Sequence, residues 1–443
     1  MLLHHAFESS CERLPDKTAV VCGDERVGYA ELGRRVRTLA ASLRDRGIAS
    51  GDRVCLFLES GVEYVVAVHA VLAAGAVFVP VSTLTKADKL AYMLADTRAT
   101  ALLTDARLAP VWGQALKSAP AIRCCVVAGE AVAGDVVLAW PPAQGGEPAT
   151  PTPSCTVEED LAAIIYTSGT TGVPKGVMLT HRNMRSAWES VQAYLGLRED
   201  DTIGLALSPA FSYGLYHVLM AMGLGATLLI ERATAFPQRI VEGLARERVT
   251  VFPGVPTLYS ALLGLATLPS FDLSSLRIVT NAAAALPVEH IRRIREWLPH
   301  ASLYSMYGMT ECKRISYLPP EQLDRRPASV GRGMPGQEHW LVDEEGRRLP
   351  NGSTGQLVVS GRHVMRGYWD KPDETAARLK PGPLPGRPLL YTGDIFRTDE
   401  DGWLYFVGRA DEVFKSRGEK VAPREVENAI YALEGVLDCA VIG

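Results

Sequence analysis

The sequence lacks the features that mark several large classes of protein. Its formal net charge is only −4, from 46 basic and 50 acidic residues, so no strong field of one sign favours nucleic acid or an anionic membrane as a partner. It has no run of about 18 apolar residues of the kind that spans a membrane, and the N-terminus MLLHHAFESSCERLPDK lacks the basic and apolar blocks of a signal peptide. We therefore expect a cytoplasmic protein whose partner is a compact small molecule.

Cysteine is also sparse, and its spacing excludes further kinds of site. The eight cysteines include no CxxC pair and no cluster with histidine at metal-binding spacing. Cys124 and Cys125 are adjacent, which makes them a poor disulfide. We interpret the cysteines as reduced thiols of an intracellular protein, most of them packed in its interior.

Strand-like and helix-like segments alternate along most of the chain. Residues 29–48 place apolar side chains on one helical face, and RVCLFL at 53–58 follows as a buried strand. The alternation recurs on both sides of residues 140–153, which are rich in Pro, Ala and Gly and predict a subdomain joint. Short strands and turns after Ser329 predict a small β subdomain. The expected fold class is therefore α/β, and 47% hydrophobic residues suffice for more than one core.

The stretch YTSGTTGVPKGV, residues 166–177, combines glycine, hydroxyl side chains and one lysine between two apolar runs. Glycine lets backbone amides approach an anion, hydroxyl groups add donors, and a lysine adds a mobile positive charge. We interpret the stretch as a phosphate cradle, although a polar hairpin turn is the alternative and the spacing is not that of a Walker loop. The residues concerned are Thr167, Ser168, Gly169, Thr170, Thr171, Gly172 and Lys175.

Three further motifs follow this loop in order: YSMYGMTE at 304–311, YTGD at 391–394 and GRADEVFKSRGEKVAPREVE at 408–427. Together the four motifs resemble those of the acyl-adenylate-forming superfamily, which includes acyl-CoA synthetases, nonribosomal-peptide adenylation domains and firefly-type luciferases. The resemblance runs from about Ala30 to the last residue.

The resemblance implies a domain organisation. A large N-terminal domain, 1–408, would contain two α/β subdomains at about 1–150 and 151–328 and a small β-barrel-like subdomain at 329–408. A hinge and an incomplete, small α+β C-terminal domain would occupy 409–443. Asp411 matches the residue about which the small domain rotates.

The resemblance also implies an activity: ATP-dependent activation of a carboxylic acid as acyl-AMP with release of pyrophosphate, followed by transfer to the thiol of coenzyme A or of a carrier-protein phosphopantetheine. The loop would hold the β and γ phosphates. Positioning and charge neutralisation supply most of the catalysis when two anions must meet. The residues carried over as catalytic are Thr167, Lys175, Thr310 and Glu311, with Glu311 as the Mg²⁺ ligand.

Other residues are carried over to the nucleotide. Tyr307, next to Gly308, matches the residue that stacks on adenine, and Thr310 the one that bonds the α-phosphate. Asp394 and Arg409 match the ligands of the ribose hydroxyl groups. TNAAAALP at 280–287 stands where the family has a glycine-richer adenine-binding turn, so Ala283 and Ala284 are expected to bind the base in a tighter loop.

The family's adenylation lysine lies further along the C-terminal domain than EGVLDCAVIG, where this sequence ends. Lys415 and Lys420 lie in the hinge motif and are not candidates for that role. On this interpretation the chain is truncated, and it should bind ATP and acid but adenylate slowly.

The segment SPAFSYGLYH, 208–217, is expected to line the acid pocket. Amino-acid adenylation domains carry there an Asp that pairs with the substrate ammonium, and this chain has Ser212. An unpaired buried ammonium is costly, so the sequence favours an aliphatic or aryl acid. The expected pocket residues are Phe211, Ser212, Tyr213, Tyr216, His217, Met309 and Cys312, with helix packing as the alternative role for Tyr213, Tyr216 and His217.

Lys313 and Arg314, directly after the glutamate of YGMTE, are unusual at that place. Either could recognise a second anionic group on the substrate, or both could point into solvent. Three other activities stay open from the sequence. They are a stand-alone enzyme that loads an amino acid such as proline onto a carrier protein, a luciferase-type oxygenase, and a non-catalytic adenylate-binding module.

Overall fold

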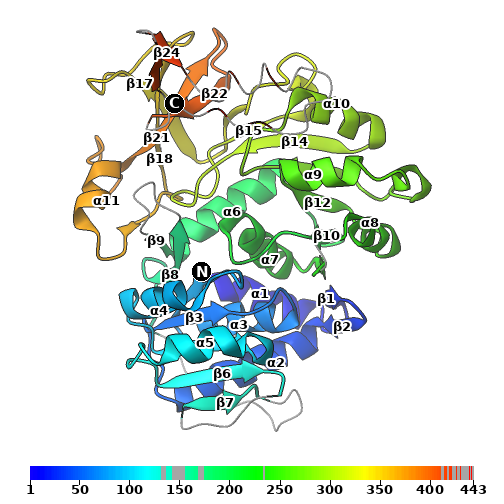
Figure 1. Cartoon of the computed structure of the whole chain (residues 1–443), viewed down its shortest axis with the longest axis vertical. Coiled ribbons are helices and arrows are strands. Elements are labelled where there is room, and N and C mark those ends of the chain that lie inside the picture. Colours follow the sequence, from blue (N-terminus) through cyan, green and yellow to red (C-terminus); the bar gives the residue numbers. More distant parts are fainter. Residues whose placement is uncertain are drawn as a thin grey trace. The chain divides into compact units, whose positions relative to one another are not determined.

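The computed structural model describes residues 1–130, 136–141, 155–167, 174–232 and 235–410, together with 414–416, 419–421 and the single residues 426, 430, 439 and 441. The chain divides into two compact units (Figure 1). The first comprises Met1–Trp188, Gly196–Ala235 and Met365–Asp370, and the second Glu189–Leu195, Phe236–Val364 and Lys371–Gly443. Parallel strands alternate with helices in both units, which confirms the α/β class.

The first unit contains a sheet of eight described strands in the order β19-β9-β8-β4-β3-β5-β6-β7. The strands from β8 to β7 run parallel, whereas β9 and β19 pair antiparallel at one edge. Strands β3 to β6 are buried along nearly their whole length, as a helix-covered parallel sheet requires. The bounds are β3 (Arg53–Phe57), β4 (Val77–Pro80), β5 (Ala101–Asp105), β6 (Cys124–Ala128), β7 (Val137–Ala139), β8 (Leu161–Thr167), β9 (Lys175–Thr180) and β19 (Gly367–Tyr368).

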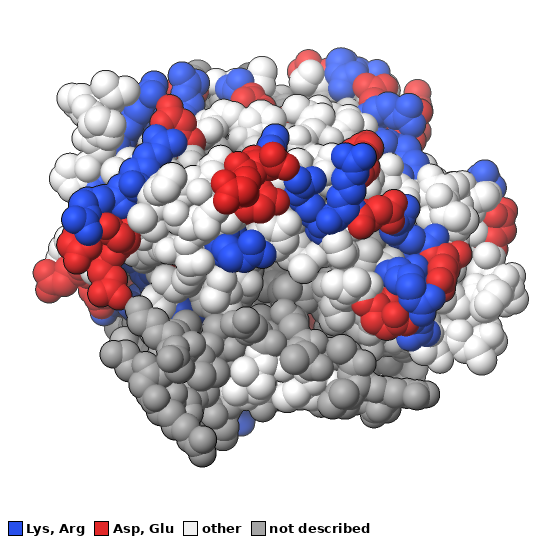
Figure 2. Space-filling model, turned by 90° about the horizontal axis from the view of Figure 1, so that it is seen from above, with Lys and Arg blue, Asp and Glu red and all other residues white. Residues whose placement is uncertain are grey.

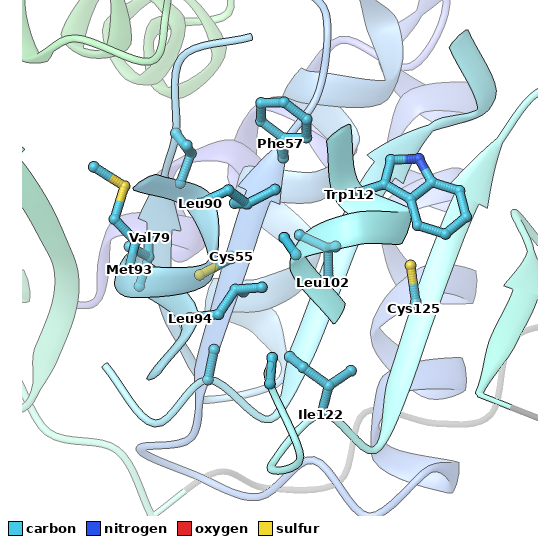
Figure 3. Close-up of a cluster of buried hydrophobic side chains, with 14 of the residues drawn as sticks. Cys55, Phe57, Val79, Leu90, Met93, Leu94, Leu102, Trp112, Ile122 and Cys125 are labelled. Atoms are coloured by element: carbon cyan, nitrogen blue, oxygen red, sulfur yellow. The ribbon is translucent and has the colours of Figure 1, made fainter. Parts of the chain in front are cut away.

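Two helices cover one face of this sheet, as Figure 3 shows. Leu90 and Leu94 of α4 (Ala87–Asp96) and Trp112 of α5 (Ala109–Leu116) belong to one buried cluster with Cys55 of β3. Ile164 of β8 is part of the same cluster. The strand that leads into the predicted phosphate loop is therefore anchored in a hydrophobic core.

A second group of strands in the first unit runs in the order β10-β11-β1-β2. β10, β11 and β1 are parallel, and β1 and β2 form an antiparallel pair. Helix α3 (Val62–Ala73) is buried from Tyr64 to Leu72 and contacts strands of both sheets, as expected of a helix that is apolar all round. The remaining bounds are β1 (Thr18–Cys22), β2 (Glu25–Gly28), β10 (Thr202–Leu205), β11 (Thr227–Ile230), α1 (Leu3–Arg13), α2 (Tyr29–Asp45) and α7 (Ser212–Leu224). Helix α6 (His181–Leu195) belongs to the first unit up to Trp188 and to the second from Glu189.

The second unit has parallel strands β12, β13 and β14, extended by antiparallel β15 and β16. Its other sheet is antiparallel, in the order β17-β18-β21-β20, with β22 paired to β21. The bounds are α8 (Pro237–Arg246), β12 (Val251–Gly254), α9 (Pro256–Leu263), β13 (Ile278–Asn281), α10 (Val288–Trp297), β14 (Ser302–Tyr307), β15 (Ser316–Leu318), β16 (Arg332–Gly333), β17 (Gln337–Val342), β18 (Thr354–Gly361), α11 (Pro372–Arg378), β20 (Leu379–Lys380), β21 (Leu389–Thr398), β22 (Leu404–Arg409), β23 (Phe414–Ser416) and β24 (Glu419–Val421).

The surface and the thiols agree with the composition. Basic and acidic side chains are interspersed over the face that Figure 2 displays. Six of the eight cysteines are buried, whereas Cys155 is exposed and Cys439 is intermediate. Among the described residues, no helix is both long and apolar enough to cross a membrane.

Candidate functional site

The predicted phosphate loop closes an antiparallel hairpin of the first unit. β8 ends at Thr167 and β9 begins at Lys175, and these two residues are Cα partners across the hairpin. The loop residues predicted to bind phosphate, Ser168, Gly169, Thr170, Thr171 and Gly172, lie outside the described residues. The structure therefore fixes both ends of the loop, and the phosphate contacts stay a prediction.

Close packing holds the second strand of this hairpin. A Cβ added at Gly176 would stand 2.6 Å from Cγ2 of Ile164, so only glycine fits against β8. On the other side, the N–H of Trp369 donates to the carbonyl oxygen of Gly176 at 2.8 Å. Lys175 Nζ lies 5.7 Å from the ring centroid of Tyr368 in β19, a cation–π distance. The start of β9, and with it the predicted phosphate-binding lysine, is thus clamped between two neighbouring strands.

A hydrogen-bonded tyrosine, Tyr166, supports the first strand of the hairpin, β8. The hydroxyl of Tyr166 donates to a carboxylate oxygen of Asp96, and Trp369 Nε1 donates to the Asp96 carbonyl oxygen at 2.9 Å. Burial, together with the hydrogen bond to Asp96 and its charge, raises the pKa of Tyr166. The phenol therefore stays protonated and holds the hairpin in place. Asp96 and Trp369 were missed by sequence reasoning, because each is far from the loop along the chain.

Helix α7 presents the segment predicted to bind the acid. Phe211 precedes the helix and is 56% exposed, and Ser212 begins it. Tyr213, Tyr216 and His217 are buried in the first unit. His217 Nδ1 lies 2.7 Å from the carbonyl oxygen of Tyr213, which can only accept, so Nδ1 donates within the helix. Only Phe211 and Ser212 of this group have appreciable exposure, and the pocket role of the group stays a prediction.

In the second unit, the predicted nucleotide residues Tyr307, Asp394 and Arg409 converge. Asp394 of β21 and Arg409 of β22 are Cα partners, with Arg409 Nη1 3.9 Å from Asp394 Oδ1. The hydroxyl of Tyr307 donates to Asp394 Oδ2. Asp394 Oδ1 is buried and has no hydrogen-bond donor among the described residues. One carboxylate oxygen is therefore fixed, and the other is available to a donor such as a ligand hydroxyl.

The electrostatics of this group follow from burial. Burial raises the pKa of Asp394, and the Tyr307 hydrogen bond and the charges of Arg409 and Arg378 oppose that rise. Burial and the negative charge of Asp394 raise the pKa of Tyr307 well above its ordinary value, so Tyr307 stays a neutral donor. The Tyr307 ring packs edge to face on Phe396, with centroids 4.8 Å apart. This aromatic neighbour was missed by sequence reasoning, since nothing in YTGDIF marks it.

Glu311 lies in a tight loop between β14 and β15. A Cβ added at Gly308 would stand 2.2 Å from the carbonyl oxygen of Lys313, so the loop closes only with glycine there. The N–H of Cys312 donates to the Met309 carbonyl oxygen at 3.1 Å. Glu311 is 8% exposed. Thr310 and Met309 are partly exposed and Cys312 is buried.

Glu311 lies close enough to the Asp394 group to influence it. Its negative charge contributes to the raised pKa of Tyr307 and of Asp394. Burial, followed by the charge of Glu311, raises the pKa of the Cys312 thiol well above its usual range. Cys312 is therefore an inert neutral group.

Carboxylate oxygens are the ligands that Mg²⁺ prefers, and the carboxylate of Glu311 fits the predicted metal.

The predicted adenine turn contains a strained alanine. Ala283 has φ +74°, a left-handed conformation that favours glycine, and both Ala283 and Ala284 are exposed. Asn281 at the end of β13 donates from Nδ2 to the Ala284 carbonyl oxygen at 3.0 Å. Asn281 Oδ1 is buried with no hydrogen-bond donor among the described residues. Asn281 was missed, although a polar residue at the end of a buried strand is a usable signal.

Residues 7–369 match the family of AMP-binding enzymes. This chain is a member of that family. Tyrocidine synthase 1 of Brevibacillus parabrevis is 30% identical over 99% of the chain, which spans 39% of that relative's length. The anthranilate CoA ligase AuaEII, solved with anthranoyl-AMP, is 27% identical with a TM-score of 0.91 over 100% of this chain and 84% of its own. VinN is 32% identical with a TM-score of 0.77 over 92% of this chain and 99% of its own, and its structure with L-aspartate is also known.

These matches confirm the predicted acyl-adenylate-forming superfamily and its fold. The chain spans 39% and 7% of the length of the first two curated relatives, Tyrocidine synthases 1 and 3 of Brevibacillus parabrevis. The predicted hinge residue of this AMP-binding enzyme, Asp411, lies outside the described residues. Lys415 and Lys420 are Cα partners in the hairpin of β23 and β24.

Proposed function

We propose that this AMP-binding enzyme activates a carboxylic acid with ATP as an acyl adenylate, releases pyrophosphate, and passes the acyl group to the thiol of coenzyme A or of a carrier-protein phosphopantetheine. The proposal rests most directly on Asp394. Its Oδ1 is a buried acceptor with no donor in the part of the chain that the structure describes, and Tyr307 and Arg409 hold the carboxylate in place. A buried carboxylate in this state suits a ligand that brings hydroxyl donors, as a ribose does.

Other residues of the second unit are proposed to bind the adenine base. The Tyr307 ring and the exposed turn of Ala283 and Ala284 would hold the adenine, with Gly308 allowing the loop to approach. Asn281 Oδ1, a second buried acceptor, suits the exocyclic amine of the base.

Adenylation requires a carboxylate to attack the α-phosphate, so two anions must be brought together. Lys175 and Thr167, at the two ends of the phosphate loop, would position the β and γ phosphates and the departing pyrophosphate. Thr310 would bond the α-phosphate. Glu311 would hold Mg²⁺, which supplies charge neutralisation when bound.

The acid would be bound by residues at the start of α7 and by residues of the loop after β14, the two segments to which the resemblance assigns this role. Phe211 and Ser212 would supply exposed pocket surface, Met309 and Cys312 the wall beside Glu311, and the other predicted residues of α7 the support beneath. A rotation at Asp411 of a C-terminal domain that begins near 409 would then change the site from adenylation to thioester formation.

A second candidate is an enzyme that loads an amino acid onto a carrier protein. It is favoured by the peptide synthetases among the relatives and by the similarity to VinN, which has been solved with L-aspartate. Ser212 argues against this second candidate, because a serine at that position offers no carboxylate to pair with a buried substrate ammonium.

The test is ATP- and Mg²⁺-dependent hydroxamate formation, measured on protein from the complete reading frame with hydroxylamine as the acceptor. A panel of fatty, aryl, cyclic-amino and α-amino acids separates the two candidates. Turnover of an acid without an amino group supports the first, whereas exclusive turnover of an amino acid supports the second. The absence of turnover with every acid would contradict both.

A further inference from the structure

Two adjacent histidines and a glutamate lie in the first turns of helix α1 in the first unit (Figure 1). His4 and Glu8 are four residues apart, so their side chains are neighbours on one face of the helix, and His5 stands beside them. One ring nitrogen of each histidine and one carboxylate oxygen of Glu8 all lie within 4.8 Å of one another. Two imidazoles and a carboxylate are a ligand set that Zn²⁺ accepts in proteins.

His4 is the fixed member of this group. It is 5% exposed, and its Nδ1 is buried with no hydrogen-bond partner among the described residues. Buried polar atoms of native proteins nearly always have a partner, and an ion is one group that can supply it. The His4 ring packs edge to face with the ring of His5, with centroids 4.6 Å apart. A buried imidazole without a partner therefore stands beside the two other ligands.

His5 and Glu8 are the adjustable members, because both side chains are exposed. The N–H of Leu2 donates to His5 Nδ1 at 3.3 Å, a long hydrogen bond that the ring can exchange for a metal ion. Zn²⁺ binds nitrogen and oxygen ligands at about 2.0 to 2.2 Å, so the three ligand atoms must approach one another when it binds. Rotation of the two exposed side chains allows this approach while the buried ring stays in place.

We propose that His4, His5 and Glu8 bind a divalent transition metal ion, with Zn²⁺ as the ion that best fits the three ligands. Three protein ligands leave a fourth tetrahedral position to water. These residues differ from Glu311, which is predicted to bind Mg²⁺, and none of them has a role in the proposed adenylation. The inference therefore goes beyond the proposed function and does not depend on it.

The metal would stabilise the first unit by holding the start of α1. This helix packs against α7, and Ser10 Oγ donates to the carbonyl oxygen of Gly223 in α7 at 3.2 Å. A metal ion that joins side chains of successive turns favours the helical state of the segment that makes these contacts. Because the ion binds the folded site and not the unfolded chain, binding raises the stability of the protein.

Isothermal titration calorimetry of the untagged protein with Zn²⁺ tests the proposal. We expect one Zn²⁺ per chain to bind, and excess Zn²⁺ to raise the melting temperature by about 2 °C or more. The variants His5→Gln and Glu8→Gln should bind Zn²⁺ at least about tenfold more weakly, since even the loss of a group that only orients a ligand costs about 10- to 100-fold. Absence of binding by the wild type, or equal affinity in the wild type and both variants, would overturn the inference.

The chain offers matched controls for these variants. Glutamine at position 5 can still accept from the N–H of Leu2, so His5→Gln removes the imidazole and keeps the cap of the helix. Glu12→Gln removes the same charge as Glu8→Gln at an exposed position one turn further along α1, and it should leave the affinity for Zn²⁺ unchanged. A loss of affinity in Glu12→Gln equal to that in Glu8→Gln would indicate a general effect of charge and contradict the assigned site.

Chemical modification locates the site on the wild-type protein without any substitution. Diethyl pyrocarbonate acylates exposed imidazoles, and the modified residues are identified by peptide mass spectrometry. At Zn²⁺ concentrations about 100 times the Kd, nearly every chain holds the ion, so labelling of His5 should fall about tenfold or more. The exposed His300 of the second unit should be labelled as before. Equal labelling of His5 with and without Zn²⁺ would overturn the inference.

Discussion

Replacement of Asp394 by asparagine should selectively lower the kcat/KM of the enzyme for ATP. Asparagine has nearly the same shape, but it removes the negative charge and exchanges one acceptor oxygen for an NH₂ donor. Asp394 Oδ2 accepts from Tyr307, and Oδ1 is the buried acceptor without a donor among the described residues. In the variant, a ribose hydroxyl that donates to Oδ1 would lose a charged acceptor.

The free energy of the lost hydrogen bond sets the size of this effect. A hydrogen bond to a charged group contributes about 1.5 to 3 kcal/mol. At about 1.36 kcal/mol for each factor of ten, kcat/KM for ATP should fall about 10- to 150-fold. The kinetics would be measured by ATP–pyrophosphate exchange at saturating acid, with ATP varied.

Two controls separate a ribose contact from a loss of fold. Asp399→Asn changes a carboxylate that follows the same strand and accepts from the Trp403 N–H and from Arg326. It should lower stability without changing the preference for ATP. In the wild type, 2′- or 3′-deoxy-ATP should lose a comparable factor, and Asp394→Asn should lose little more with the deoxy substrate. Equal losses with ATP and the deoxy nucleotides in the variant would refute the ribose assignment.

Three further predictions follow from other parts of the molecule. Ala283→Gly should raise the free energy of unfolding by about 1 kcal/mol in urea titrations, because φ +74° strains alanine; a decrease would contradict the strain. Gly176→Ala should lower stability and kcat together, since its Cβ would meet Ile164 at 2.6 Å, and an unchanged kcat would refute the clamp. Burial lowers the pKa of His69 to about 4 from 6.5, so stability present above pH 6.5 is lost as pH falls towards 4, by about 3 kcal/mol. In the His69→Gln variant, the urea midpoint of unfolding should fall less steeply than in the wild type as the pH is lowered from 6.5 to 4. An unchanged pH dependence would contradict this prediction.

The local periodicity of apolar residues was sufficient to predict helices and strands such as the following two. The expected helix at 29–48 is α2 (Tyr29–Asp45), and the expected strand at 53–58 is β3 (Arg53–Phe57). Both are set by residues close in sequence, which pattern reasoning can detect. The loop that joins β8 and β9 was likewise expected between two strands, because glycine and proline interrupt two apolar runs.

Contacts between distant residues could not be predicted in the same way. Tyr307 and Asp394 were each assigned to the nucleotide from their motifs, but the hydrogen bond between them joins residues 87 apart. The support of Tyr166 by Asp96 spans 70 residues and carries no sequence signature. Lys313 is 4% exposed and Arg314 is 2% exposed, so the alternative that both point into solvent is wrong, although hydropathy alone places such residues in solvent. Such contacts depend on how the strands are arranged in the sheet.

The central claim is that the chain forms an acyl adenylate, and the products of ATP test it most directly. Protein from the complete reading frame, given ATP, Mg²⁺, hydroxylamine and a panel of mono- and dicarboxylic acids, should form a hydroxamate together with equal amounts of AMP and pyrophosphate. Formation of ADP and phosphate, or hydroxamate without consumption of ATP, would contradict the account.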